Sequence, residues 1–178
     1  MTSGVNNIIR IAITGPESTG KSSLAKKLAG HFGTVWVPEY ARAYLDKLKR
    51  AYTERDLLKI AKGQINSERE IFETAKRMIF YDTELLVIKI WANHKYGRIH
   101  PWILSNYNKI SYDLYLLTYP DLPWEYDPLR ENPEKGNYFF SIFEKELIAR
   151  KAKYKIIRGN HDERMIAAID FIEKRLNF

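Results

Sequence analysis

One segment of the chain has the residue types and the spacing of a phosphate-binding loop. Residues 15–22 read GPESTGKS and match the pattern G-x-x-x-x-G-K-[ST] in full. In such a loop the backbone N–H groups cradle nucleotide phosphates, the lysine reaches the β- and γ-phosphates, and the last hydroxyl ligates Mg²⁺. We therefore expect ATP and Mg²⁺ as cofactors. The predicted nucleotide-binding residues are Gly15, Glu17, Ser18, Thr19, Gly20, Lys21, Ser22 and Ser23.

The sequence on either side of this loop has the order that the motif requires. Residues 8–14 are mostly β-branched and apolar, as in a buried parallel strand, and residues 23–29 have helical spacing. A strand that leads through a glycine-rich loop into a helix is the setting of a phosphate site. The context therefore favours a working site over a chance glycine turn.

Two carboxylates and one arginine supply the other groups that phosphoryl transfer needs. Asp82 ends an apolar run and is expected to bind Mg²⁺ or meet an acceptor hydroxyl, with a helix-capping role as the alternative. Glu39 also follows an apolar run, and it either accepts a hydroxyl proton or pairs with Arg42 on the surface. Arg130 ends a long polar loop at 120–130, which we interpret as a lid that brings the arginine to the transferred group.

Aromatic residues are the candidates for stacking an aromatic substrate. The candidates are Trp91 and Trp102. Because tryptophans at helical spacing more often belong to a core, core packing is the alternative to substrate binding. Asp113 stands at the start of an expected strand, which is the end away from the site, so we interpret it as structural. The four histidines have no metal-ligand spacing and receive no role.

The elements that must position these residues alternate between strands and helices. Strands are expected at 8–14, 34–37, 78–82, 112–118 and 154–157. Helices are expected at 23–29, from Pro38 to 45, at 54–76 after a capping box, between the cap Thr83 and Gly97, from 133, and at 161–176. This alternation predicts an α/β fold whose five-stranded parallel sheet carries helices on both faces, with ligands beyond the carboxyl ends of the strands. Strand 34–37 is expected beside the first strand.

Composition agrees with one small enzyme domain covering residues 1–178. The absence of cysteine excludes a disulfide framework and a cysteine nucleophile. No apolar run approaches a membrane span or a signal peptide, so we expect a cytoplasmic protein without a membrane partner. The net charge of +7, from 29 Lys and Arg against 22 Asp and Glu, suits anionic substrates or a solvated basic surface. The sequence has no stripe that interleaves basic and aromatic residues, so we expect no nucleic-acid partner. It also contains no pattern that predicts an oligomeric state.

Taken together, the motifs resemble a known family. The strings GPESTGKSSL, VPEYARAYL, QINSERE, FYDTELL, KIW and YDLYLLTYPDLPWEYDPLR are similar to the ribosylnicotinamide kinase domain of the NadR type, over about residues 8–176. The resemblance implies a P-loop fold like the thymidylate and nucleoside kinases, with a lid. It also implies transfer of the ATP γ-phosphate to the 5′-hydroxyl of nicotinamide riboside. Longer relatives add nucleotidyltransferase and DNA-binding domains, which we do not expect in this chain.

The resemblance implies that Lys21 and Ser22 bind phosphate and Mg²⁺ and that Arg130 belongs to the lid. The expected catalytic residues are Lys21, Glu39, Asp82 and Arg130, the metal ligands are Ser22 and Asp82, and the acceptor site is Glu39, Tyr40, Arg42, Asp82 and Trp91. Where relatives tend to carry another lid arginine, this chain has Lys135, which would act as a point charge.

Two questions stay open at this point. Either Glu39 or Asp82 orients and deprotonates the acceptor hydroxyl. The alternatives to a riboside kinase are a kinase for another small acceptor, such as a deoxynucleoside or a nucleoside monophosphate, and a non-enzymatic ATP-binding switch. A monophosphate acceptor calls for extra arginines, and Arg42 is the only one near the site in sequence.

Overall fold

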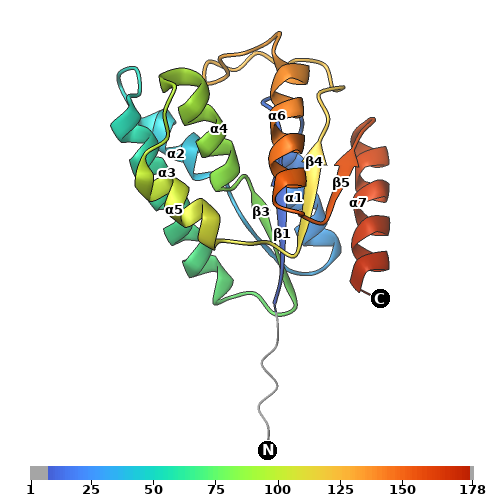
Figure 1. The fold of residues 1–178 in the computed structure, drawn as a ribbon. Coiled ribbons are helices and arrows are strands. Elements are labelled where there is room, and N and C mark those ends of the chain that lie inside the picture. The colour runs from blue at the N-terminus through green and yellow to red at the C-terminus, as the bar shows by residue number, and fades with distance from the viewer. Residues whose placement is uncertain (1–7, 177–178) are drawn as a thin grey trace, which may run out of the picture.

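The structure is a computed structural model that describes residues 8–176, and its elements alternate as expected (Figure 1). The strands of the described part are β1 (Ile9–Thr14), β2 (Val35–Val37), β3 (Met78–Asp82), β4 (Leu114–Thr118) and β5 (Tyr154–Ile157). Its helices are α1 (Lys21–His31), α2 (Tyr40–Lys47), α3 (Glu54–Phe72), α4 (Leu85–Tyr96), α5 (Pro101–Lys109), α6 (Gly136–Ala149) and α7 (His161–Leu176).

The five strands form one parallel sheet in the order β2-β3-β1-β4-β5. The expectation that residues 34–37 pair with the first strand is therefore wrong, because β3 lies between them. All five residues of β3 are buried, which suits a central strand, whereas the three-residue β2 is partly exposed and occupies an edge. Val37 pairs with Tyr81, so Asp82, the last residue of β3, and Glu39, two residues after β2, lie at the same edge of the sheet.

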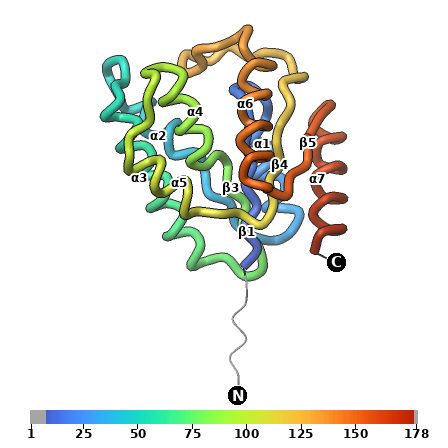
Figure 2. Tube along the Cα trace, viewed as in Figure 1, coloured from blue at the N-terminus to red at the C-terminus, as the bar shows by residue number. Residues whose placement is uncertain are grey.

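Helices cover both faces of the sheet, and the side chains of each strand alternate between them. Ile11 and Ile13 of β1 pack with Leu28 of α1 and Ile172 of α7 on one face. Ala12 belongs to the cluster on the opposite face, which α2 to α6 cover (Figure 2). Within residues 8–176, no helix combines the length and apolarity that crossing a bilayer requires.

Several helix ends follow the sequence signals. Thr53 and Asp56 form the predicted capping box at the start of α3, and Gly97 ends α4 with a φ of 65°. The cap of α4 differs, because Glu84 rather than Thr83 accepts a hydrogen bond from the first turn. Pro38 also lies outside the first turn of α2, since Glu39 is the residue that caps it.

Helix α5 was not expected from the sequence. The segment from Gly97 to the fourth strand carried no assigned element, yet residues 101–109 are helical. Pro101 opens the helix at its first turn, and the His100 side chain accepts a hydrogen bond from the backbone N–H of Trp102. Proline at the first helical position is the signal that would have identified this helix.

The loop at 119–135 joins β4 to α6 and arches over the carboxyl ends of the strands (Figure 1). We call it the lid. The lid lies against the phosphate loop, to which it is joined by hydrogen bonds.

Arg164 of α7 ties together the loops at this edge of the sheet. The residue is 1% exposed. Its guanidinium donates hydrogen bonds to the carbonyl oxygens of Gly159 at 2.7 Å, Thr19 at 3.0 Å and Tyr119 at 2.8 Å, and it pairs with the carboxylate of Asp121. One buried cation therefore joins α7 to the phosphate loop and to the base of the lid.

Replacing Arg164 by Met should lower the free energy of unfolding by about 2–4 kcal/mol, because three carbonyls and one carboxylate lose their partner. Arg158→Met is the matched control, since Arg158 is exposed and contacts only the ring of Tyr119, a contact worth about 0.5–1 kcal/mol. Urea unfolding measures both variants. Equal, small losses would contradict the role given to Arg164.

Candidate active site

A cleft of about 670 Å³ opens at the carboxyl edge of the sheet. The phosphate loop forms one wall, the start of α2 and the lid form others, and α4 and α6 add an apolar side. Its polar lining includes residues 15–23, Glu39, Arg42, Glu125, Arg130, Asn132 and His161. Its apolar lining includes Leu45, Val87, Ile90, Trp91, Phe139 and Phe143. A cleft with charges at one end and aromatic and aliphatic groups at the other suits a phosphorylated nucleotide beside an aromatic acceptor.

The phosphate loop has the backbone conformation that anion binding needs. Gly15 has a φ of 138°, and a Cβ at this position would lie 2.5 Å from the Thr118 hydroxyl, so only glycine fits. Gly20 caps α1 without a side-chain hydrogen bond, so the first N–H groups of the helix are open to phosphate. The Thr19 hydroxyl lies 2.8 Å from the Pro16 carbonyl oxygen and 2.7 Å from the Thr118 hydroxyl. Thr19 therefore shapes the loop with its side chain, while its carbonyl oxygen accepts from Arg164.

Lys21 stands at the centre of the charged end of the cleft. Its ammonium group donates to the carbonyl oxygens of Gly15 at 3.0 Å and Pro16 at 2.6 Å. Burial lowers the pKa of Lys21, and the negative charges of Glu39 and Asp82 oppose that change. Lys21 therefore interacts electrostatically with both predicted carboxylates, while its hydrogen bonds go to the backbone of its own loop.

The two carboxylates lie in related but unequal surroundings. Burial raises the pKa of Glu39 and of Asp82, and the charge of Lys21 lowers both. Hydrogen bonding from Ser22 lowers the pKa of Asp82 further. Glu39 lines the cleft, whereas Asp82 is only 3% exposed and lies beneath it. Proximity to Ser22 therefore distinguishes Asp82 from Glu39.

One oxygen of Asp82, Oδ1, is buried without a hydrogen-bond partner among the described residues. An unpaired carboxylate oxygen next to a phosphate-loop serine fits the oxygen donors that Mg²⁺ prefers. The described residues contain no group of three or more acidic or histidine side chains that could hold a metal alone. Ser22 and Asp82 would therefore share Mg²⁺ with waters and nucleotide phosphates, as is usual for this ion.

Arg42 does not form the surface pair with Glu39 that the sequence left open. Its guanidinium contacts the carboxylate of Asp127 in the lid at 2.6 Å. Arg42 lines the cleft from the first turn of α2. This pair connects the start of α2 to the lid.

The lid rests on the phosphate loop through two side chains of that loop. Arg130 donates to the Ser18 hydroxyl at 3.1 Å. Glu17 accepts hydrogen bonds from the backbone N–H groups of Glu131 at 3.1 Å and Asn132 at 3.2 Å. Glu17 and Ser18 therefore contact the lid with their side chains, and Arg130 lies beside the phosphate loop as predicted.

The two tryptophan candidates separate clearly in the structure. Trp91 lines the cleft, and its ring contacts that of Tyr52 at a centroid distance of 5.3 Å. Its indole N–H is buried without a hydrogen-bond partner among the described residues. Trp102 lies on α5, outside the cleft lining, where Lys62 approaches its ring at 5.4 Å. Of these two tryptophans, Trp91 alone lines the cleft.

Two predicted contacts lie elsewhere. The ring of Tyr40 packs onto α3, where a Cβ at Gly63 would collide with it, and Tyr40 is absent from the cleft lining. As the first residue of α2, it directs its ring toward the neighbouring helix. The Lys135 ammonium lies 3.4 Å from the His94 ring of α4, so the structure gives it no contact with the phosphate loop.

His161 is a cleft residue that the sequence reasoning missed. It opens α7 and lies against Gly20, where an added Cβ would be 3.6 Å from the His161 ring. It directly follows the turn after the last strand, so the rule that ligands bind at the carboxyl ends of strands was the signal available.

Comparison with known proteins identifies the family of this chain. The family model of the AAA domain matches residues 10–164. The trifunctional NAD biosynthesis/regulator protein NadR of Escherichia coli (strain K12) is 26% identical over 178 residues, which cover 93% of this chain and 42% of that protein. The chain thus spans less than half the length of this relative.

Solved structures give the same fold. A crystal structure of a NadR protein in complex with NR superimposes with a TM-score of 0.82 at 20% identity, covering 96% of this chain and 52% of that chain. Thymidylate kinase from Ehrlichia chaffeensis gives a TM-score of 0.62 at 14% identity, covering 94% and 98%. These likenesses confirm the predicted P-loop fold and the resemblance to the NadR type. Because the family model spans the phosphate loop, Glu39, Asp82 and the lid, this chain belongs to the AAA domain family.

Proposed function

We propose that this chain transfers the γ-phosphoryl group of ATP to the 5′-hydroxyl of nicotinamide riboside and so forms nicotinamide mononucleotide. The observation that carries the proposal is that Glu39 and Asp82 lie at the carboxyl ends of adjacent strands, where the charges of both act on Lys21 of the phosphate loop. The similarity to NadR proteins, one of which was solved with NR bound, supports this choice of acceptor. The likeness to thymidylate kinase supports the wider class of kinases with small acceptors.

The charged end of the cleft suits the phosphate chemistry. Lys21 and the N–H groups at the start of α1 would neutralise the phosphates of ATP. Ser22 and Asp82 would hold Mg²⁺, which when bound bridges and neutralises the β- and γ-phosphates. Arg130 would exchange its hydrogen bond with Ser18 for a phosphate oxygen, so that lid contacts strengthen as charge develops on the transferred group.

The position of Glu39 in the cleft lining suits it to the acceptor hydroxyl. Glu39 lines the cleft and Asp82 does not, while Asp82 adjoins Ser22. We therefore assign acceptance of the hydroxyl proton to Glu39 and binding of Mg²⁺ to Asp82. The 5′-oxygen would lose its proton to the Glu39 carboxylate and bond to the γ-phosphorus. The bond from that phosphorus to the β–γ bridging oxygen would break, and ADP would leave.

The far end of the cleft suits a cationic aromatic ring. The pyridinium of the riboside carries a positive charge, and the face of an indole attracts such a ring. Trp91 supplies that face, and the apolar side chains of α4 and α6 exclude water around it. The neutral bases of other nucleosides would be attracted less strongly to the face of Trp91.

The acceptor should be identifiable by direct competition. With ATP and Mg²⁺, the purified chain should convert nicotinamide riboside to the mononucleotide with kcat/KM at least about tenfold above thymidine, deoxyadenosine and nucleoside monophosphates, because a cation–π contact is worth about 1–2 kcal/mol. Mass spectrometry follows the product. Lys21→Ala is the control for a contaminating kinase and should lose about a hundredfold or more in rate.

Each other outcome of this assay rejects the proposal in a defined way. Faster turnover of thymidine or a monophosphate would assign the chain to a kinase with a different acceptor. ATP binding without turnover of any acceptor would indicate a non-enzymatic switch.

Removing the charge of each carboxylate should separate their roles. Glu39→Gln should lower kcat by about 10²–10⁴-fold with a smaller change in KM, as for a lost general base. The activity lost in Asp82→Asn should be partly restored by a higher concentration of Mg²⁺. Because burial raises the pKa of Glu39, the acid limb of the kcat profile should lie above the ordinary glutamate value of about 4.3 and should vanish in Glu39→Gln. Wild-type steady-state kinetics in both variants would refute both roles.

A further inference from the structure

A buried amide lies between the two strand ends that carry the carboxylates. Gln64 of α3 is 1% exposed. Its Oε1 accepts a hydrogen bond from the backbone N–H of Tyr40 at 2.9 Å, and its Nε2 donates to the carbonyl oxygen of Thr83 at 3.4 Å. Tyr40 directly follows Glu39, and Thr83 directly follows Asp82. One side chain therefore contacts the backbone next to each carboxylate.

The backbone at Thr83 is held in an unusual conformation. Its φ is 76°, a left-handed value that is unfavourable for a β-branched residue. The Thr83 N–H donates to the carbonyl oxygen of Ile13 at 3.1 Å, and the Thr83 carbonyl accepts from Gln64. Contacts from both sides thus fix the turn that sets the direction of Asp82.

The segment at Tyr40 is also held twice by α3. The amide of Gln64 accepts its N–H, and the neighbouring Gly63 leaves the space that the Tyr40 ring fills. A side chain at position 63 would push the ring away. The start of α2, and with it Glu39, is therefore docked on the middle of α3.

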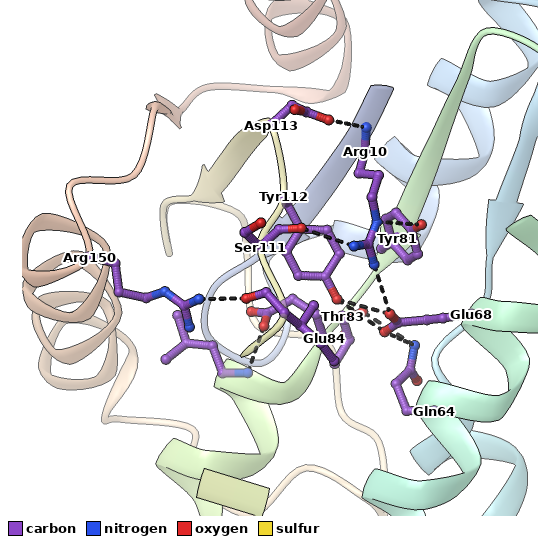
Figure 3. A network of polar contacts seen from close by, with 12 residues as sticks. Arg10, Gln64, Glu68, Tyr81, Thr83, Glu84, Ser111, Tyr112, Asp113 and Arg150 are labelled. Carbon is purple, nitrogen blue, oxygen red and sulfur yellow. Dashed lines mark hydrogen bonds and ion pairs between the residues drawn. The ribbon is translucent and has the colours of Figure 1, made fainter. Parts of the chain in front are cut away.

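The orientation of the Gln64 amide is set by its own surroundings (Figure 3). Its Nε2 lies 3.4 Å from a carboxylate oxygen of Glu68, which also accepts from the Tyr112 hydroxyl at 3.0 Å and lies 3.7 Å from Arg10. Because the Tyr40 N–H can only donate and the Thr83 carbonyl can only accept, the amide oxygen faces Tyr40 and the NH₂ group faces Thr83 and Glu68. The backbone groups at the two strand ends thus select the amide orientation, and Glu68 lies on the NH₂ side.

We infer that Gln64 is a positioning residue that sets the distance between Glu39 and Asp82 by clamping the residue after each of them. The inference rests on the function proposed above. Gln64 does not line the cleft, so it acts through the backbone and touches no substrate. Its amide is neutral, so it orients the carboxylates without changing the charge balance around Lys21. A displacement of about 1 Å between reacting groups lowers rates by about a hundredfold, so this clamp bears directly on kcat.

Gln64→Met removes both contacts at similar volume and is the first test. We expect kcat to fall by about tenfold to a hundredfold, with KM for ATP within about twofold of wild type, because the phosphate loop is untouched. Tyr112→Phe is the matched control. It removes one buried hydrogen bond from the same network but neither contact to Tyr40 or Thr83, so its kcat should stay within about twofold. Thermal unfolding of both variants verifies that each is folded.

Gln64→Glu gives a readout that a purely structural role would not move. The introduced carboxyl accepts from Tyr40 in either form, but it donates to Thr83 only when protonated. The ratio of its kcat to that of wild type should therefore fall as pH rises. The same ratio for Gln64→Met should stay flat with pH.

The outcomes separate this inference from the proposed function. A folded Gln64→Met with wild-type kcat overturns the positioning role and does not affect the kinase proposal. A wild-type chain that phosphorylates no riboside rejects the proposed function, and the clamp is then read from amide hydrogen exchange. Exchange at the Tyr40 N–H should speed up at least about tenfold in Gln64→Met and not in Tyr112→Phe. Unchanged Tyr40 exchange in Gln64→Met would overturn the clamp.

Discussion

Parallel pairing of β2 with β3 is the constraint on which the site depends. The pairing of Val37 with Tyr81 brings the ends of both strands to one level, so Glu39 and Asp82 emerge together. Pairing of β3 with β1 then brings Asp82 beside the phosphate loop, because Asp82 lies opposite Ile13. If β2 were shifted by one residue, its side chains would exchange faces and Glu39 would leave the cleft. The chemistry of the site therefore follows from strand register.

The charged groups at this edge stabilise one another in the absence of a ligand. Burial lowers the pKa of Lys21 and raises the pKa of Glu39 and Asp82, while their mutual attraction opposes each change. Lys21 also donates to carbonyls of its own loop, and Arg130 to Ser18, so both cations have partners that a phosphate can replace. A nucleotide would thus enter a site whose donors are already oriented, which reduces the reorganisation needed for transfer.

Local patterns predicted much of this arrangement. The phosphate loop is contiguous in sequence, and the buried run at 78–82 ends at Asp82 because β3 is central and apolar. The position of β2 could not be predicted, since three residues carry too little pattern to choose a neighbour. The directions of Tyr40 and Lys135 also depend on contacts with α3 and α4 that no local spacing encodes. Gln64 opens the string QINSERE, which carries no recognisable chemistry in sequence, and only the folded chain brings it between two distant strand ends.

A ternary crystal structure with nicotinamide riboside and a non-hydrolysable ATP analogue tests the central claim most directly. The account predicts a Glu39 oxygen within about 2.6–3.2 Å of the riboside 5′-oxygen. It also predicts the γ-phosphate at Lys21 and the pyridinium within about 6 Å of the Trp91 ring centroid. A riboside bound elsewhere, or a 5′-oxygen turned away from both Glu39 and Asp82, would contradict it.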